Sequence, residues 1–242
     1  MRFINLAGYK FVRLDGLPEL RAGFKECCGS LGLKGTILLS PEGINVFVAG
    51  SEAAVTRFKA FVHADSRFAG LRFKKSVSAS QPFKRMLVKI KREIITLRVT
   101  GVDPAAQRAP GITAAELKRW LDDGRELVLL DTRNAFEVAT GTFRNAIHLD
   151  LKSFGDFPRA ADRLDESLKS RTIVAFCTGG IRCEKAAPLL IQKGFRSVFQ
   201  LEGGILQYFE ECGDAHFQGR CFVFDQRTAL DGNLNPQPTD AQ

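Results

Sequence analysis

The 242-residue sequence has no C-x-x-C pair among its six cysteines, no apolar run near the length of a membrane span, and no signal-peptide pattern at its N-terminus. A membrane helix needs about 20 consecutive apolar residues, so we expect no membrane segment. Closely spaced cysteine pairs are typical of structural zinc sites, and we therefore expect no metal site. Without an export signal, we expect a cytoplasmic protein whose cysteines are free thiols rather than a disulfide framework.

Proline is also scarce, with 9 residues, while hydrophobic and charged residues make up 45% and 26% of the chain. These values are typical of folded proteins, and the length suits two domains. Glycines and prolines between residues 101 and 111 mark a boundary. We predict a first domain with its connector over 1–100, a second over 101–230, and a disordered polar tail over 231–242.

Apolar patterning predicts strands and helices in the order βαββαβ in the first domain, which indicates a ferredoxin-like α+β fold. The strands are expected at 3–11, 35–39, 44–48 and 71–77, and the helices at 17–31 and 51–62. Residues 84–100 are predicted to form an extended connector that leaves this domain.

Short apolar strands alternate with helices in the second half, which predicts an α/β domain with a parallel sheet covered on both faces. Ligands of such sheets bind at the carboxyl ends of the strands. Asp131, Cys177 and residues 201–204 are expected at such ends.

One apolar run, residues 172–176, leads directly into Cys177 and a glycine-rich turn, and a helix is expected to begin near Cys183. Backbone N–H groups and the helix dipole would then point at the cysteine sulfur and lower its pKa. We predict a nucleophilic thiol at Cys177, with Arg182 supplying a fixed positive charge. The active-site loop comprises Thr178, Gly179, Gly180, Ile181, Arg182 and Cys183.

Cys177 and Arg182 form C-x-x-x-x-R, one residue shorter than the loop of cysteine phosphatases. A seven-residue loop encircles a phosphate, whereas this tighter ring suits one sulfur atom or a small group carried on the cysteine. The length therefore favours sulfur chemistry over phosphate chemistry.

Several neighbours are candidate supporting residues. Asp131 and Arg133 either pair to brace the loop or form a helix cap beside a surface arginine, and Glu137 follows one helical turn later. Cys183 either resolves an oxidised or persulfidic Cys177 or simply packs. We expect the positive charge of Lys185 to raise the electrostatic potential near the Cys177 thiolate.

The charge of the chain is uneven: residues 1–100 hold 18 Lys and Arg against 7 Asp and Glu, whereas residues 101–242 hold 17 against 20. The densest part, between residues 72 and 92, has no acidic residue and includes two phenylalanines. It is either a solvated face or a nucleic-acid site, since phosphate binding and base stacking need these two residue types. Its basic residues are Arg72, Lys74, Lys75, Lys84, Arg85, Lys89, Lys91 and Arg92.

The segment Cys177–Ala186, Asp131-x-Arg133 with Glu137, and Leu201–Ile205 resemble the rhodanese domain. Together with Gly35–Asn45, Gly141–Phe143 and the segment 219–225, they make the chain resemble the bacterial rhodanese-domain tRNA wobble-uridine hydroxylases over residues 1 to 231. The resemblance implies hydroxylation of the wobble uridine of tRNA at C5, with molecular oxygen as co-substrate. It further implies that Cys177 is essential and forms a persulfide, that Arg182 and the loop amides stabilise its charge, and that the basic domain holds tRNA.

Three functions stay open at this point: the hydroxylase, a sulfurtransferase that moves sulfane sulfur through Cys177 from a sulfur donor, and a non-catalytic RNA-binding scaffold. The intact Cys177 and Arg182 count against the scaffold. No Rossmann, flavin or iron motif is recognisable, so no cofactor and no electron donor is assigned. Many relatives continue into a cysteine-containing tail where this chain has the polar residues 231–242.

Overall fold

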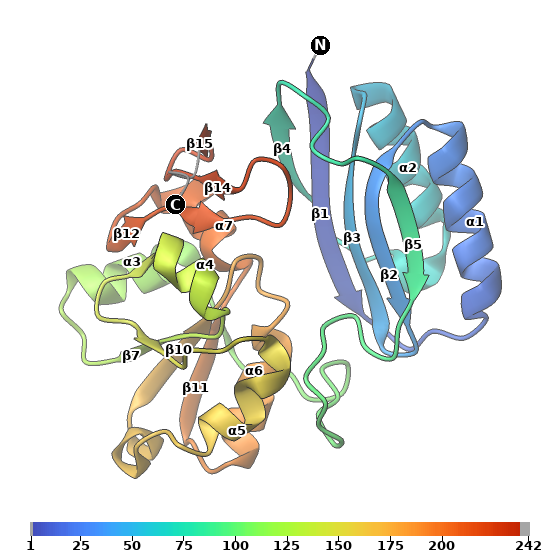
Figure 1. Cartoon of the computed structure of the whole chain (residues 1–242). Coiled ribbons are helices and arrows are strands. Elements are labelled where there is room, and N and C mark those ends of the chain that lie inside the picture. The colour runs from blue at the N-terminus through green and yellow to red at the C-terminus, as the bar shows by residue number, and fades with distance from the viewer. Residues whose placement is uncertain (1, 238–242) are drawn as a thin grey trace. The chain divides into compact units, whose positions relative to one another are not determined.

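The chain folds into two compact units, Met1–Ile94 and Ile95–Gln242, in a computed structural model that describes residues 2–237 (Figure 1). The division falls inside the segment that was predicted as a connector. Each unit has its own sheet and its own hydrophobic core.

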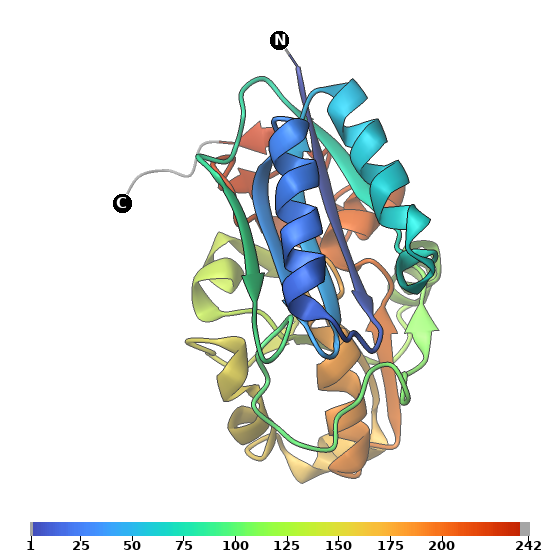
Figure 2. The same cartoon turned by 90° about the vertical axis from the view of Figure 1, so that its right-hand side faces the viewer.

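The first unit contains a five-stranded sheet with the strand order β4-β1-β3-β2-β5. Its first four strands and two helices follow the predicted βαββαβ order, so the ferredoxin-like α+β fold is confirmed. Both helices cover the same face of the sheet (Figures 1 and 2). The elements are β1 (Phe3–Phe11), α1 (Leu17–Ser30), β2 (Lys34–Ser40), β3 (Gly43–Gly50), α2 (Glu52–Ala64), β4 (Lys74–Ser78) and β5 (Met86–Ile90).

The fifth strand corrects the prediction for residues 84–100. Instead of leaving the domain as a connector, Met86–Ile90 pairs in parallel with β2 and forms an edge of the sheet. Only Val88 of this strand is buried. A strand with one buried side chain has too short an apolar pattern to be distinguished from a linker by sequence.

The second unit contains a five-stranded sheet with the order β6-β11-β10-β7-β9, and every pair of neighbours is parallel. This confirms the predicted α/β domain. Its main elements are β6 (Gly111–Ile112), α3 (Ala114–Asp122), β7 (Val128–Asp131), α4 (Ala135–Thr140), β9 (Ile147–His148), α5 (Phe157–Ala161), β10 (Thr172–Phe176), α6 (Cys183–Gln192), β11 (Ser197–Leu201) and α7 (Gly204–Cys212).

Helices cover both faces of this sheet. Successive side chains of a strand point to opposite faces, so a strand with apolar residues at every position needs a helix layer on each side. In β10, Ile173 packs into the cluster under α5 and α6, whereas Val174 packs into the cluster under α3 and α7. Such a doubly covered sheet leaves its strand ends as the accessible place for a site.

Short strands that the sequence did not predict complete the unit. β8 (Gly141–Phe143) pairs with β12 (Phe217–Gly219), and β13 (Cys221–Phe222), β14 (Ala229–Leu230) and β15 (Pro236–Gln237) form a small antiparallel sheet. Within the segment predicted as a polar tail from residue 231, β15 pairs with β14. Residues 238–242 lie outside the described part of the chain. Over residues 2–237, no helix has the length and apolar character needed to cross a bilayer.

Candidate active site

The two strands that carry the predicted site residues are neighbours in the sheet and end at the same edge. β7 ends at Asp131, β10 ends at Phe176, and these two residues are paired in register. The chain continues from Phe176 through the loop 177–182 into α6, so the sulfur of Cys177 lies between a strand end and a helix start.

The Cys177 thiol is buried, and its Sγ accepts a hydrogen bond of 3.1 Å from the backbone N–H of Gly180. Burial opposes ionisation of this thiol. A hydrogen bond from Cys183, the charge of Arg182 and the backbone N–H groups of Arg182 and Gly180 outweigh that penalty and lower the pKa of Cys177 to about 6. At neutral pH the group is therefore a thiolate, which is the nucleophilic form.

The second cysteine of the loop serves the first as a hydrogen-bond donor. Burial and the neighbouring Cys177 sulfur raise the pKa of Cys183, so Cys183 keeps its proton. Its Sγ lies 3.7 Å from the hydroxyl of Thr132. The pKa of Cys177 is lowered while that of Cys183 is raised, which gives Cys183 the role of an S–H donor to the thiolate, a role that its position in the sequence did not reveal.

Arg182 is held by a carboxylate that comes from α4. Its Nη1 donates to Oε1 of Glu137 at 3.1 Å, and its Nη2 lies 2.8 Å from Oε2. Glu137 is fully buried and also accepts a hydrogen bond from the Thr178 hydroxyl at 3.3 Å. One carboxylate therefore orients both the arginine and the loop residue that follows the cysteine.

Asp131 and Arg133 form a fully buried ion pair, and Arg133 is not a surface residue. The Arg133 Nε donates to Asp131 Oδ1 at 2.9 Å, and Nη2 donates to Oδ2 at 2.6 Å. Nη2 also donates to the carbonyl of Gly141 at 2.6 Å, and the Thr142 hydroxyl donates to Asp131 Oδ2 at 2.7 Å. The pair thereby braces the end of β7 against β8.

Two glycines are required by the backbone of the site. Gly180 has φ 94°, in the left-handed region. Gly204, at the start of α7, has φ +64°, and a Cβ there would lie 2.3 Å from the carbonyl oxygen of Cys177. The next two residues of α7 hold the loop through the bonds Ile205 N to Cys177 O at 2.9 Å and Leu206 N to Thr178 O at 3.1 Å.

Lys185 lies in the first turns of α6 and is buried. Its Nζ donates to the carbonyl of Ile95 at 2.9 Å, which ties the helix to the segment where the second unit begins. The electrostatic influence of Lys185 on the thiolate stays a prediction.

The basic residues between 72 and 92 do not form one continuous patch. Lys74 lies on β4, opposite Ala7 of β1, and Lys89 lies on β5, opposite Leu38 of β2. These strands are opposite edges of the sheet, separated by about 19 Å at the usual spacing between strands. Lys75 is already paired with Glu52 at 2.9 Å. The charges therefore border both edges of the sheet.

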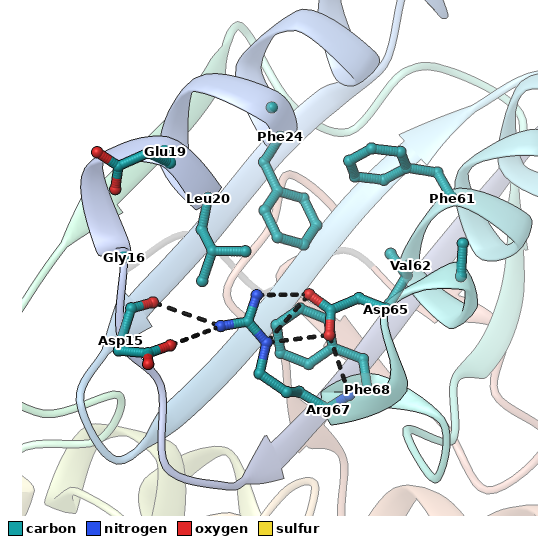
Figure 3. A pocket seen from close by; sticks show the side chains of 12 residues that line it. Asp15, Gly16, Glu19, Leu20, Phe24, Phe61, Val62, Asp65, Arg67 and Phe68 are labelled. Atoms are coloured by element: carbon teal, nitrogen blue, oxygen red, sulfur yellow. Dashed lines mark hydrogen bonds and ion pairs between the residues drawn. The ribbon is translucent and has the colours of Figure 1, made fainter.

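A hollow of about 840 Å³ lies between α1 and α2 of the first unit (Figure 3). Its one basic group, Arg67, donates to Asp65 through Nε at 3.0 Å and Nη2 at 2.6 Å and to Asp15 through Nη1 at 3.0 Å. Because both carboxylates neutralise the guanidinium, this hollow offers no free charge to an anionic ligand. Over residues 2–237, no group of three or more His, Cys, Asp or Glu side chains is placed to hold a metal ion.

Comparisons with known proteins agree with this architecture. Residues 3–94 match the UPF0176 acylphosphatase like domain, and residues 113–211 match the rhodanese-like domain. A solution structure of a rhodanese-like domain from Anabaena is 23% identical, with a TM-score of 0.40, over 55% of this chain and 89% of that one. The two family matches make the chain a two-domain protein, with an acylphosphatase-like domain followed by a rhodanese-like domain.

Relatives that match over nearly the whole chain identify the family within this class. A tRNA uridine(34) hydroxylase from Cupriavidus taiwanensis is 54% identical over 98% of this chain and 86% of that protein. One from Variovorax paradoxus is also 54% identical, over 98% of this chain and 92% of that protein. The chain belongs to the tRNA uridine(34) hydroxylase family.

Proposed function

We propose that this protein hydroxylates C5 of the wobble uridine of tRNA in the cytoplasm, with Cys177 as its reactive centre. The observation that carries the proposal is the buried Cys177 thiolate, with a pKa lowered to about 6, in a chain that shares 54% of its residues with tRNA uridine(34) hydroxylases.

The first chemical step in this proposal is the loading of Cys177 with sulfur. The thiolate attacks the outer sulfur of a sulfane donor, a new S–S bond forms on Cys177, and the donor leaves as its own thiolate or sulfite. Arg182 and the N–H groups of Gly180 and Arg182 lower the pKa of the thiol by stabilising negative charge. The same groups stabilise the negative charge of a persulfide at this position.

In the second step, one atom of molecular oxygen enters the C5–H bond of the uridine. The other oxygen atom leaves as water, which requires two electrons and two protons, and a dithiol donor supplies both as it is oxidised to a disulfide. Glu137 fixes Arg182 during these steps, because a bidentate carboxylate allows the guanidinium one orientation.

Mass spectrometry of tRNA nucleosides tests the proposal in cells that lack the gene. Wild type is expected to restore 5-hydroxyuridine and its derivatives, and Cys177→Ser is not. Cys212→Ser is the matched control, since Cys212 is half-buried at the end of α7 and is expected to restore the product. Growth with isotopically labelled oxygen gas is expected to label the new hydroxyl. If the deletion leaves these nucleosides unchanged, the proposal is wrong.

A sulfurtransferase activity is the second candidate, because the six-residue loop and the Cys177 thiolate suffice for it. Purified protein that transfers sulfur from thiosulfate to cyanide, combined with unchanged tRNA nucleosides in the deletion strain, supports this candidate over the hydroxylase.

A further inference from the structure

Three phenylalanine rings, two exposed and the third, Phe222, half-buried, form a cluster in the second unit. The centroids of Phe136 and Phe222 are 5.1 Å apart, those of Phe222 and Phe224 are 5.2 Å apart, and those of Phe136 and Phe224 are 6.2 Å apart. Phe224 is 57% exposed and Phe136 is 49% exposed, whereas Phe143 and Phe176 of the same unit are buried. Grouped exposed aromatic rings of this kind mark a binding surface.

The cluster adjoins the Cys177 site from two elements. Phe136 lies in α4 directly before Glu137, the carboxylate that holds Arg182. The Phe224 ring centroid is 5.7 Å from the Arg182 guanidinium carbon. Cys221, the first residue of β13, lies beside the loop, where the Thr178 hydroxyl opposes the rise in the pKa of Cys221 that burial causes.

Hydrogen bonds and an ion pair hold the segment that carries Phe224 in place. Val223 N donates to the carbonyl of Thr228 at 2.9 Å, and Arg227 binds Asp225 through Nε at 2.8 Å and Nη2 at 2.5 Å. A side chain on such a turn is preorganised, so a ligand does not have to order it on binding.

The chemistry of the cluster suits a planar ring. The three rings pack nearly edge to face, at 82° to 88°, and the exposed parts of Phe136 and Phe224 offer aromatic surface on which a planar ring can pack. Nucleobases stack on such surfaces, and Arg182 adds donors for a carbonyl oxygen at the edge of the base. Enzymes that act on a base take it out of its stack and hold it between aromatic side chains.

We infer that Phe136, Phe222 and Phe224 form the subsite for the pyrimidine base of the target nucleotide, beside the Cys177 sulfur. The inference deepens the proposed function and rests on it. A protein that delivers sulfur is the competing occupant, and the experiment below separates the two.

A double-mutant cycle between Phe224 and the base tests the subsite. The probes are a fluorescent RNA hairpin with the wobble uridine in its loop and the same hairpin with an abasic site there. We expect wild type to bind the uridine hairpin roughly fivefold to a hundredfold more tightly than the abasic one, from the usual strength of base stacking on an aromatic ring. Phe224→Ala is expected to lose this preference, and Phe224→Trp to keep it.

Ile191→Ala is the matched control, because Ile191 is 44% exposed on α6 and lies outside the cluster. It is expected to keep the preference. The alkylation rate of Cys177 is expected to be the same in wild type and Phe224→Ala, which shows that the variant has an intact thiol site. Equal preference in wild type and Phe224→Ala overturns the subsite.

Two further measurements separate the subsite from its alternatives. If Phe224→Ala slows loading of Cys177 by a sulfur donor and leaves the base preference intact, the cluster binds the donor and the inference is wrong. In the gene-deleted cells, restored hydroxylation with both wild type and Phe224→Ala overturns the subsite alone. Failure of wild type itself to restore the product counts against the proposed function, while the hairpin cycle still reports on the subsite.

Discussion

Arg182 and Glu137 form a bidentate ion pair across 45 positions of the sequence, with Nη1 to Oε1 at 3.1 Å and Nη2 to Oε2 at 2.8 Å. The side chains are only 7% and 0% exposed. The pair joins the active-site loop to α4, so the position of the positive charge near Cys177 depends on a residue from a different element.

Replacement of Glu137 by Gln is expected to destabilise the protein by about 3 to 5 kcal/mol, because removal of one partner leaves a buried charge uncompensated. Urea unfolding measures the loss. Glu116→Gln is the control: its 3.7 Å contact with Arg119 is exposed, and a change within about 0.5 kcal/mol is expected. Equal stability of the two variants would contradict the structural role of Glu137.

The reactivity of Cys177 is expected to follow its lowered pKa. Alkylation by iodoacetamide requires the thiolate, so the rate should be constant above pH 7 and fall below the pKa of about 6. Cys183→Ala removes the S–H donor and is expected to shift the midpoint to higher pH, since the thiolate loses a hydrogen bond. A profile of Cys183→Ala that overlays wild type would show that Cys183 merely packs.

Gly204 and Gly124 offer a comparison of two glycines with nearly the same positive φ, +64° and +65°. Alanine at either position carries a cost of about 1 to 2 kcal/mol for the left-handed conformation. Only at Gly204 does the new Cβ also collide with the loop, 2.3 Å from Cys177 O, whereas Gly124 has open space around it. We expect Gly204→Ala to unfold at a lower urea concentration than wild type and to raise the pKa of the Cys177 thiol. Gly124→Ala is expected to leave that pKa unchanged.

Much of the site could be predicted from the sequence because its central residues are local. Cys177, Gly180 and Arg182 lie in one short loop between a strand and a helix, and their spacing carries the chemistry. The pairing of Arg182 with Glu137 joins residues far apart in the chain, and no spacing rule reveals it. Of the two glycines in the loop, only Gly180 has a positive φ, whereas Gly179 has open space around it and its φ is not positive.

The strands, too, could be predicted only where a local apolar pattern marks them. Strands with a full apolar pattern, such as β3 and β10, were predicted close to their observed bounds. The edge strand β5 and the pair β14 and β15 were missed. These strands are short and carry little apolar pattern, and their pairing depends on residues elsewhere in the chain.

The separation of basic residues onto two edges leads to a prediction about tRNA binding. Lys84, Arg85 and Lys89 are exposed at the β5 edge, and replacement of all three by Gln is expected to weaken binding and reduce the slope of log affinity against log salt by about 2. The slope changes because each lost phosphate contact releases one fewer condensed counterion. Filter binding over a salt series measures both quantities.

Lys118, Lys169 and Lys193 provide a control with the same change of charge, because each is paired with an acidic side chain of the second unit, Asp122, Glu166 and Asp162 respectively. Their joint replacement by Gln is expected to leave the slope within experimental error of wild type, since charges already balanced by carboxylates attract phosphate weakly. If the β5 triple variant and this control change the slope equally, tRNA responds to the net charge of the protein and not to the edges of the sheet.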